Sequence, residues 1–300
     1  MAAATSRKKK GASSAAGGQP PADSRVVESF MAQMGGARKR VDPLEAAQEI
    51  MWDAWDLTDR PQRVALARKA LEVSPLCADA YVMLAMETAS SSDEALRLYR
   101  QGVEAGEKAL GKAAFSDDVG SFWGILETRP YMRARQGLAE ALWTTGLRDE
   151  AVEHYQDMLR LNPNDNQGIR YLLLDRLLAL GRDDGATGLL KRYEDDGAAA
   201  WTWSKALLSF RRDGDSAASR EALGRAVESN ARVPAYLLGH KKIPRQLPAY
   251  ISRGDEDEAI AYVHTAAEAW AASSGALPWL ETARPAPSLH RKKSSTKQRP

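Results

Sequence analysis

The sequence predicts an all-α fold, a right-handed α-solenoid of about six helical hairpins with one insertion. Apolar residues recur at three- and four-residue spacing through residues 43–283, and no alternation of apolar and polar residues indicates a sheet. The turn glycines Gly146, Gly181, Gly214 and Gly254 follow one another at intervals of 35, 33 and 40 residues. Because one helical hairpin cannot bury its own apolar face, we expect successive hairpins to stack.

The first hairpin is predicted to begin at Asp42-Pro43, a capping residue followed by a proline. Its second helix starts near Pro61 and ends before Pro75. The second hairpin is expected between residue 78 and about residue 106, with a turn at residues 90–93. Each of these segments has one apolar stripe at helical spacing, so each predicts an amphipathic helix.

Four further hairpins follow the same pattern. We expect them at residues 129–163, 166–194, 201–229 and 233–272, the last with a longer lead-in that is interrupted by prolines. Five tryptophans fall on the helical stripes of the chain and are expected to be packing anchors: Trp52, Trp55, Trp201, Trp203 and Trp270. Acidic pairs at turns and helix starts, such as Asp183-Asp184, are expected to act as helix caps.

The charge of the chain is unevenly distributed. The 300 residues have a formal net charge of +2, but residues 284–300 contain six Lys or Arg and no acid. Residues 1–42 begin with a basic run and are rich in Ala, Ser and Gly, which predicts a disordered arm with one short helix around residues 26–34. Residues 284–300 are predicted to be a disordered tail, which leaves residues 43–283 as an acidic repeat domain.

The composition argues for a soluble protein of a reducing compartment. The single cysteine, Cys77, excludes an internal disulfide framework. The sequence shows no secretory signal and no apolar stretch of 18 residues, so no membrane insertion is predicted. We therefore expect a cytoplasmic location, or a nuclear one in a eukaryotic cell because of the basic terminal runs.

The central hairpin resembles the tetratricopeptide repeat in its order of small and large residues, with Gly146 at the turn and Ala151, Tyr155 and Pro163 after it. The phrases SFWGILETRPYMRARQGLAEAL and LNPNDNQGIRYLLL resemble a family of tetratricopeptide-like proteins of unassigned function. The resemblance implies a scaffold of helical hairpins and supplies no reaction.

Two other phrases, ALEVSPLCADAYVMLA and AVESNARVPAYLLG, resemble the C-terminal repeat region of the suppressor of tumorigenicity 7 family. This resemblance covers roughly residues 43–280. Members of that family have transmembrane segments ahead of the repeats. Since this chain shows none, a membrane role is not implied for it.

The insertion at residues 107–130 contains the densest cluster of unusual residues. In a solenoid the first helices of the hairpins line the concave face, so we predict that a peptide segment of a protein partner binds there. Arginine forks and aromatic faces favour such recognition. The predicted partner-binding residues are Trp123, Glu127, Arg129, Tyr131, Arg133, Gln136, Glu140, Trp143, Asn166, Arg170, Tyr171 and Asp175. Asn164 and Asn166 are also expected to cap the helix that follows them.

Other interpretations of this cluster stay open. Trp123 and Tyr131 are equally consistent with packing between an irregular and a regular repeat. Arg129, Arg133 and Arg170 are consistent with a site for a small anionic ligand, or with a catalytic site of unrecognised type. The basic ends are consistent with nonspecific contacts to nucleic acid, although the acidic domain would repel such a polymer.

No motif predicts an enzyme, a metal or a cofactor. Residues 106–113, GEKALGKA, match most of a phosphate-binding loop, but a helix precedes them where that motif needs a strand, and Ala113 replaces the hydroxyl residue. The four histidines are far apart, and none lies at ligand spacing from a cysteine or a second histidine. His154 is expected to be an exposed residue of its helix.

Overall fold

The computed structural model describes residues 42–283, and every regular element in that range is a helix. The chain divides into two compact units between Leu177 and Leu178, a boundary that falls within one helix. The first unit is described here for residues 42–177 and the second for residues 178–283. The predicted arm and tail lie outside the described residues.

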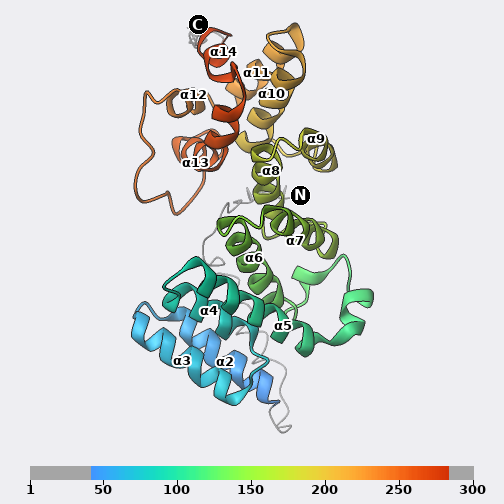
Figure 1. The fold of residues 1–300 in the computed structure, drawn as a ribbon, viewed down its shortest axis with the longest axis vertical. Helices are drawn as coiled ribbons and strands as arrows, with labels where there is room; N and C mark the ends of the chain where they lie inside the picture. Colours follow the sequence, from blue (N-terminus) through green and yellow to red (C-terminus); the bar gives the residue numbers. More distant parts are fainter. Residues whose placement is uncertain (1–41, 284–300) are drawn as a thin grey trace, which may run out of the picture. The chain divides into compact units, whose positions relative to one another are not determined.

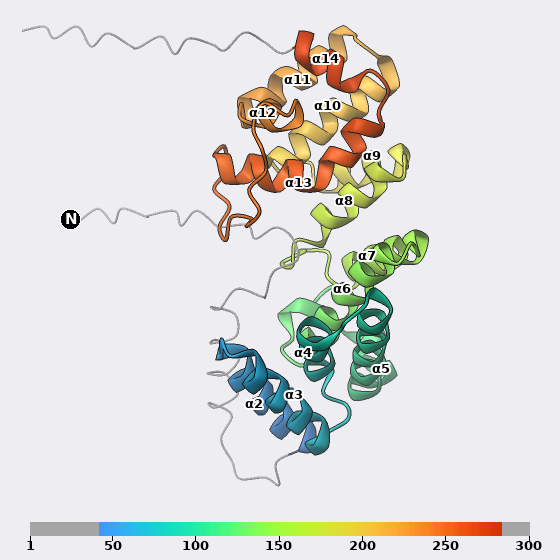
Figure 2. The ribbon, with the colours of Figure 1, turned by 60° about the vertical axis from the view of Figure 1, so that its left-hand side comes forward.

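The first unit begins with two antiparallel hairpins. Helices α2 (Pro43–Asp56) and α3 (Arg60–Val73) form the first, and α4 (Ala78–Thr88) and α5 (Ser92–Asp117) form the second. Helices α2, α3 and α4 lie side by side (Figures 1 and 2). The predicted start at Asp42 is confirmed, because its side chain accepts a hydrogen bond from the backbone N–H of Leu44 at 3.0 Å.

Helix α5 runs further than the repeat pattern predicts and takes up the first half of residues 107–130. Gly111, with φ +72°, interrupts it. A short 3-10 helix, η1 (Phe122–Gly124), and an irregular stretch then lead to α6 (Arg129–Thr144). This segment is therefore mostly ordered helix that packs against α6.

The central hairpin consists of α6 and α7 (Arg148–Leu161), and the turn between them has Gly146 at φ +87°. Helix α8 (Ile169–Ala179) follows. The core of this unit is made of large side chains with almost no exposed surface: Met51, Met83, Tyr131, Met132, Leu142, Tyr155 and Met158. Burial of these side chains supplies the main stabilisation of the stacked helices.

The second unit contains α9 (Asp183–Arg192), the hairpin of α10 (Ala199–Asp213) and α11 (Ala217–Ser229), and the pair α13 (Glu256–Ala272) and α14 (Ala276–Ala283). The positive φ angles of Gly181 and Gly214 confirm the predicted turns. Asp183 and Asp184 do not cap α9 as expected, because the N-cap residue is Arg182 and no side chain caps the helix. They lie in its first turn, where negative charge favours the helix dipole.

The sixth hairpin differs from the prediction. Its first helix, α12 (Val233–Leu237), has five residues, and a long irregular loop connects it to α13. Prolines at positions 244 and 248 disfavour helix in this loop. Figures 1 and 2 show the loop between α12 and α13. Helix α14, which the pattern search missed, follows a turn at Gly275, whose φ is +78°.

Tryptophans organise the core of the second unit. Trp201, Trp203 and Trp270 have no exposed surface, and the rings of Trp203 and Trp270 lie 6.2 Å apart in an edge arrangement. With Trp55 at 4% exposed, these residues confirm the prediction of packing anchors, whereas Trp52 is only partly buried.

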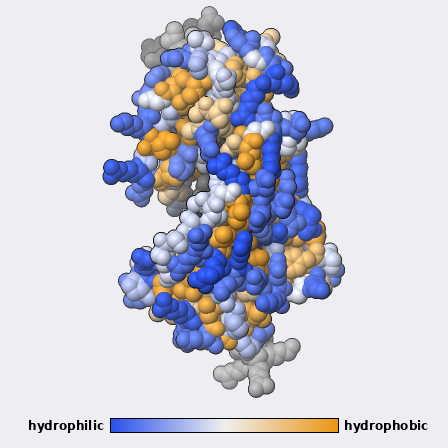
Figure 3. Space-filling model, viewed as in Figure 1, coloured by the Kyte–Doolittle hydropathy of each residue, from blue (hydrophilic) through white to orange (hydrophobic). Residues whose placement is uncertain are grey.

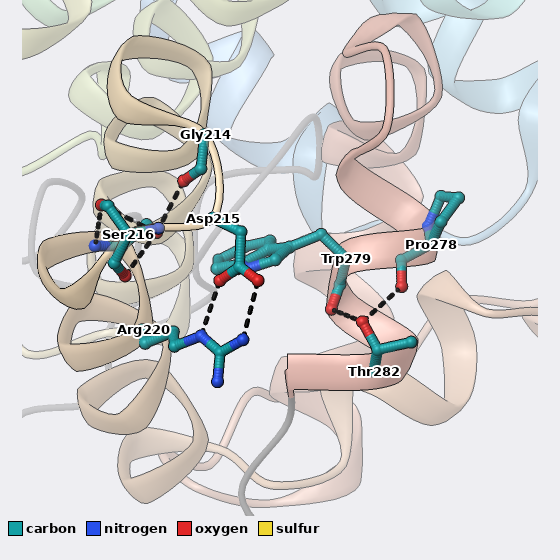
Figure 4. A network of polar contacts seen from close by, with 8 residues as sticks. Gly214, Asp215, Ser216, Arg220, Pro278, Trp279 and Thr282 are labelled. Carbon is teal, nitrogen blue, oxygen red and sulfur yellow. Dashed lines mark hydrogen bonds and ion pairs between the residues drawn. The ribbon is translucent and has the colours of Figure 1, made fainter.

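Helix α14 is fixed to the α10–α11 turn by Trp279. Its ring stacks on Phe210 with centroids 4.5 Å apart, and its indole Nε1–H donates to the carboxylate of Asp215 at 3.1 Å. The same carboxylate accepts two hydrogen bonds from Arg220, and Figure 4 shows this network with the neighbouring caps. These contacts explain why residues 276–283 form an additional helix that no repeat pattern predicts.

Apolar side chains are not confined to the interior. Figure 3 shows separate apolar patches among polar residues on the viewed face. Tyr250, in the α12–α13 loop, is the most exposed large hydrophobic residue of the described chain at 84%. Single exposed apolar residues are usual on protein surfaces and carry no functional meaning by themselves.

Candidate functional site

The candidate site is a cavity of about 460 Å³ in the first unit. Its walls come from α2, from the start of α4, from the middle of α5 and from the connection that leads into α6. The lining residues are Asp42, Leu44, Glu45, Gln48, Trp52, Leu76, Ala78, Gly106, Ala109, Leu126, Glu127, Pro130 and Tyr131. The first helices of three successive hairpins thus contribute to one hollow.

Close contact between α5 and α6 shapes one side of the cavity. A Cβ atom at Gly106 would lie 2.9 Å from the Cβ atom of Tyr131, so only glycine permits this approach. The ring of Tyr131 packs edge-on against Phe115 and Phe122, with centroids 5.1 and 6.1 Å away. Burial raises the pKa of Tyr131 to about 12, so its hydroxyl stays neutral.

The connection between η1 and α6 is held in place by its own hydrogen bonds. The hydroxyl of Thr128, which is buried, donates to the carbonyl oxygens of Phe122 and Ile125. These bonds fold the chain back, and the residues between them, Leu126 and Glu127, line the cavity. The insertion therefore forms a wall of the site.

A buried ion pair supports the floor of the cavity. The Nε–H group of Arg133 donates to Oδ1 of Asp79 at 2.8 Å, and its Nη2–H group donates to Oδ2 at 2.6 Å. Asp79 has no exposed surface. Gln48 lines the cavity, and its Nε2–H group donates a hydrogen bond to the same carboxylate at 2.8 Å. This network connects α2, α4 and α6 and fixes the Gln48 amide.

Cys77 lies next to this network and is buried. Its thiol is 4.0 Å from Oε1 of Gln48. Burial, with a smaller contribution from the carboxylate of Asp79, raises the pKa of Cys77 to about 12. A thiol with so high a pKa is not a nucleophile at neutral pH, so Cys77 has a packing role.

The charged residues that line the cavity, among residues 42–283, have one sign. They are Asp42, Glu45 and Glu127, and no Lys, Arg or His of the described range lines it. The other lining side chains are apolar or aromatic except for Gln48. A hollow with an apolar floor and acidic edges can accept an apolar group together with a positive charge.

Two of the predicted partner-binding residues, Glu127 and Tyr131, line the cavity. Trp123 and Arg129 belong to the same connection, where Nε of Arg129 donates to the carbonyl oxygen of Trp123 at 2.9 Å. The guanidinium carbon of Arg129 lies 5.4 Å from the centre of the Trp123 ring. The structure therefore brings these four residues together, and Arg129 is engaged within its own loop.

Four predicted residues have little exposed surface, although one of them, Tyr131, lines the cavity. Tyr131, Arg133, Tyr171 and Asp175 are only 2 to 8% exposed. Periodicity alone does not show which polar side chains of a helix are covered by the next one. Arg133 faces Asp79, 54 residues earlier in the sequence, which no local pattern reveals.

Gln136, Glu140 and Trp143 lie on α6 opposite α8, and all three are partly buried. Glu140 is 3.6 Å from Arg176, whose guanidinium carbon lies 4.6 Å from the centre of the Trp143 ring. Gln136 accepts a hydrogen bond from Gln167 at 3.4 Å. These contacts hold the two helices together, so the three residues do not join the cavity.

The predicted caps of α8 were displaced by one residue. Asp165, not Asn164 or Asn166, accepts hydrogen bonds from the backbone N–H groups of Ile169 and Arg170 at 2.7 and 2.9 Å. Asn166 is exposed. The Nη1–H group of Arg170 donates to Oδ2 of Asp165 at 2.9 Å. The guanidinium carbon of Arg170 lies 4.5 Å from the centre of the Tyr171 ring. Arg170 therefore connects the first turn of α8 to the loop before it.

His154 is not the exposed residue that the sequence predicts. It is half-buried and accepts a hydrogen bond from Nε of Arg135 at 3.1 Å. Burial and the neighbouring guanidinium lower the pKa of His154 to about 4. Arg135 also donates to Tyr131 at 2.8 Å and pairs with Asp157, so this group links α6 to α7.

Sequence reasoning missed the contribution of α2. Leu44, Gln48 and Trp52 are spaced by four residues, so they share one face of the helix, while the buried stripe contains Ala47 and Met51. That second stripe was a signal in the sequence. The same residues also fit the prediction of core packing, in which Trp52 is an anchor.

Other chemistry finds little support in the described residues. Among residues 42–283, no helix is long and apolar enough to cross a membrane, and no three His, Cys, Asp or Glu side chains are grouped as a metal site. Residues 106–113 lie within α5, which Gly111 interrupts, and they follow a helix and not a strand. The strand that precedes a phosphate-binding loop is therefore absent there.

Comparisons with known proteins identify the family. The family model described as ST7 protein matches residues 39–286. The chain belongs to the ST7 protein family. It is 31% identical over 262 residues to the suppressor of tumorigenicity 7 protein-like of Bos taurus and 30% identical to that of Homo sapiens, covering 80% of this chain in both cases. The suppressor of tumorigenicity 7 protein of Macaca fascicularis is 29% identical over 79% of this chain.

This member of the ST7 protein family spans about half the length of the curated relatives it matches, 47% of the bovine protein and 52% of the macaque one. Among solved structures, the chain is similar to YrrB, described as a tetratricopeptide-repeat protein with an unusual peptide-binding site. That match has a TM-score of 0.44 and 17% identity and covers 67% of this chain and 91% of YrrB.

Proposed function

We propose that this chain is a non-enzymatic adaptor that binds a segment of another protein in the cavity formed by α2, α4, α5 and the connection into α6. The observation that carries the proposal is the cavity of about 460 Å³, which lies where the first helices of successive hairpins meet. Stacked helical hairpins present such concave surfaces to extended partners. The location of the protein in the cytoplasm stays a prediction.

The chemistry of the lining supports binding in preference to catalysis. The lining contributed by residues 42–283 includes no Ser, Thr, Cys, His or Lys, so these residues offer the cavity no side-chain nucleophile of those types and no histidine base. Most of its surface comes from Leu, Ala, Pro and aromatic side chains. Apolar surface of this kind gains free energy when a partner covers it.

A site for a small anionic ligand at the arginines has less support. Arg133 pairs with Asp79, Arg170 pairs with Asp165, and Arg129 contacts Trp123. An anion would have to replace these internal partners, two of which are carboxylates in charge-assisted bonds. The basic ends, through which nucleic acid would bind, lie outside the described residues.

The test uses peptides selected against the immobilised full-length chain from a random displayed library. The binding of each selected peptide, labelled with fluorescein, is then measured by anisotropy with the wild type and with Ala109→Phe, which adds a ring to the cavity lining. We expect Ala109→Phe to weaken binding by at least roughly tenfold, equivalent to about 1.4 kcal/mol.

The matched control is Ala113→Phe on the same helix, where the side chain is exposed and does not line the cavity. It should leave affinity within about twofold, a difference of roughly 0.4 kcal/mol. Circular dichroism checks that both variants keep the wild-type helix content. If no selected peptide distinguishes Ala109→Phe from Ala113→Phe, the cavity is not the binding site and the proposal fails.

A further inference from the structure

Within the described part of the chain, the charged residues that line the cavity are all acidic. Asp42 and Glu45 come from the start of α2, and Glu127 comes from the connection before α6, about 80 residues later in the sequence. The apolar floor between them includes Leu44, Trp52 and Leu126. Two separate elements therefore bring carboxylates to one apolar hollow.

Two of these carboxylates, those of Glu45 and Glu127, have no structural partner among the described residues. Glu45 and Glu127 are exposed, and neither makes an ion pair or a side-chain hydrogen bond with any of residues 42–283. Asp42 uses one oxygen to cap α2. By contrast, the nearby carboxylate Asp79 is fully engaged, with Arg133 and Gln48.

The occupant therefore needs positive charge and apolar surface together. We propose that the partner segment carries a Lys or Arg beside at least one bulky apolar residue, and that Glu45 and Glu127 select that cation. This inference rests on the proposed function, because it names the chemistry of the segment that the cavity binds. The methylene stem of Lys or Arg covers apolar floor while its charged end reaches the acidic edge.

Other classes of macromolecule fit the cavity less well. Nucleic acid and acidic peptides would bring negative charge to a lining whose charged members, among residues 42–283, are carboxylates, and like charges in close contact oppose binding. The proposed recognition thus differs from the arginine-based recognition that the sequence predicts. The arginines of this region stabilise the fold, and the free charges at the cavity are carboxylates.

The charges contribute to specificity more than to total affinity. Glu45 and Glu127 are in contact with solvent, so each ion pair with a bound segment adds modestly and weakens as salt rises. Burial of the neighbouring apolar side chain supplies the larger share of the binding free energy. We therefore expect affinity to fall as ionic strength rises, with a smaller residual affinity at high salt.

The probe is a hexapeptide library in which each position in turn is fixed as Lys, Arg, Glu or Leu, with both ends blocked. Anisotropy competition with the full-length wild type should favour Lys or Arg at one position and Leu beside it, and disfavour Glu. The variant Glu45→Gln/Glu127→Gln should weaken the best Lys peptide by roughly tenfold. The same variant should leave the matched peptide with Leu in place of Lys unchanged.

The control variant is Glu72→Gln/Glu153→Gln, which removes two exposed carboxylates of the same unit that do not line the cavity. Its net charge equals that of the cavity variant. The comparison therefore separates recognition by the two cavity carboxylates from the effect of the protein's net charge. It should retain the wild-type affinity. Equal weakening by both variants would overturn the inference.

Two further outcomes are decisive. If peptides are blocked by Ala109→Phe but show no preference for Lys or Arg, this inference fails while the proposed function stands. If Ala109→Phe blocks no peptide, the proposed function itself fails.

A further variant, Arg38→Ser/Lys39→Ser/Arg40→Ser, should leave affinity unchanged. A tenfold gain would assign the cavity to the chain's own basic residues before Asp42 and overturn a partner as its occupant.

Discussion

Asp79 and Arg133 show how two charged side chains can be structural in a helical repeat. Both are nearly fully buried, and each satisfies the other through two hydrogen bonds. A buried ion pair adds little net stability compared with apolar residues of the same size, but loss of one partner leaves the other charge buried and uncompensated. The pair therefore fixes how α4 and α6 meet.

We predict that Asp79→Ala lowers the free energy of unfolding by about 3–5 kcal/mol, because it isolates the Arg133 guanidinium. Urea denaturation followed by circular dichroism measures the change. Glu150→Ala, which removes an exposed carboxylate 3.8 Å from Arg100, should cost less than about 1 kcal/mol. If the double variant Asp79→Leu/Arg133→Met is no more stable than Asp79→Ala, the unpaired charge is not the cause.

A second prediction concerns His154, whose pKa is lowered to about 4 by burial and by Arg135. In the unfolded chain a histidine has a pKa of about 6.5, so between these values only the unfolded state binds the proton. Stability contributed by neutral His154 is therefore complete above about pH 6.5 and is lost as the pH falls toward 4.

We expect the free energy of unfolding of the wild type to fall more steeply between pH 7 and pH 5 than that of His154→Gln. Urea titrations at several pH values give both curves. His264→Gln, at an exposed position, serves as the control and should follow the wild type. Parallel curves for the wild type and His154→Gln would contradict the prediction.

At the scale of elements, the packing of α5 on α6 decides the shape of the site. Gly106 lies at the point of closest approach, and Tyr131 is its neighbour across the contact. Glycine is a weak helix former, so an alanine there would be favourable by about 1 kcal/mol in an isolated helix. The tertiary contact has the opposite effect, since the Cα of Tyr131 would lie only 3.1 Å from the new methyl group.

We predict that Gly106→Ala destabilises the protein by about 1–3 kcal/mol, because overpacking outweighs helix propensity. Gly224→Ala is the matched control, since Gly224 lies within α11 with no atom near its absent side chain. That variant should stabilise the protein by about 0.5–1 kcal/mol. The midpoint temperatures of thermal unfolding of the two variants should thus shift in opposite directions. Shifts of the same sign would show that the contact between Gly106 and Tyr131 does not decide the stability of the variant.

At the scale of the whole molecule, all described residues that line the proposed site belong to the first unit. A ligand slows hydrogen exchange where it suppresses local opening of the backbone. We expect a saturating concentration of the best selected peptide to slow exchange in residues 43–56 and 122–131. Mass spectrometry should find exchange in residues 199–229 unchanged, and protection confined to the second unit would contradict the assignment.

Much of the fold could be predicted because the interactions that specify it are local. Helical spacing of apolar residues, glycines at turns and the Asp42 cap are all readable over a few neighbouring positions. The five-residue helix α12 and the additional helix α14 were not predicted. Helix α14 depends on Trp279 contacting Phe210 and Asp215, more than 60 residues away.

The sequence by itself determined an all-α chain of successive hairpins with acidic residues in its folded part and basic residues at its ends. Only the tertiary structure decided which charged residues are free. Arg133 and Arg170 are engaged by carboxylates, while Glu45 and Glu127 are left at an apolar cavity. The physical reason is that periodicity assigns a residue to a face of its helix, but the distant residue opposite that face decides whether its charge is buried, paired or available.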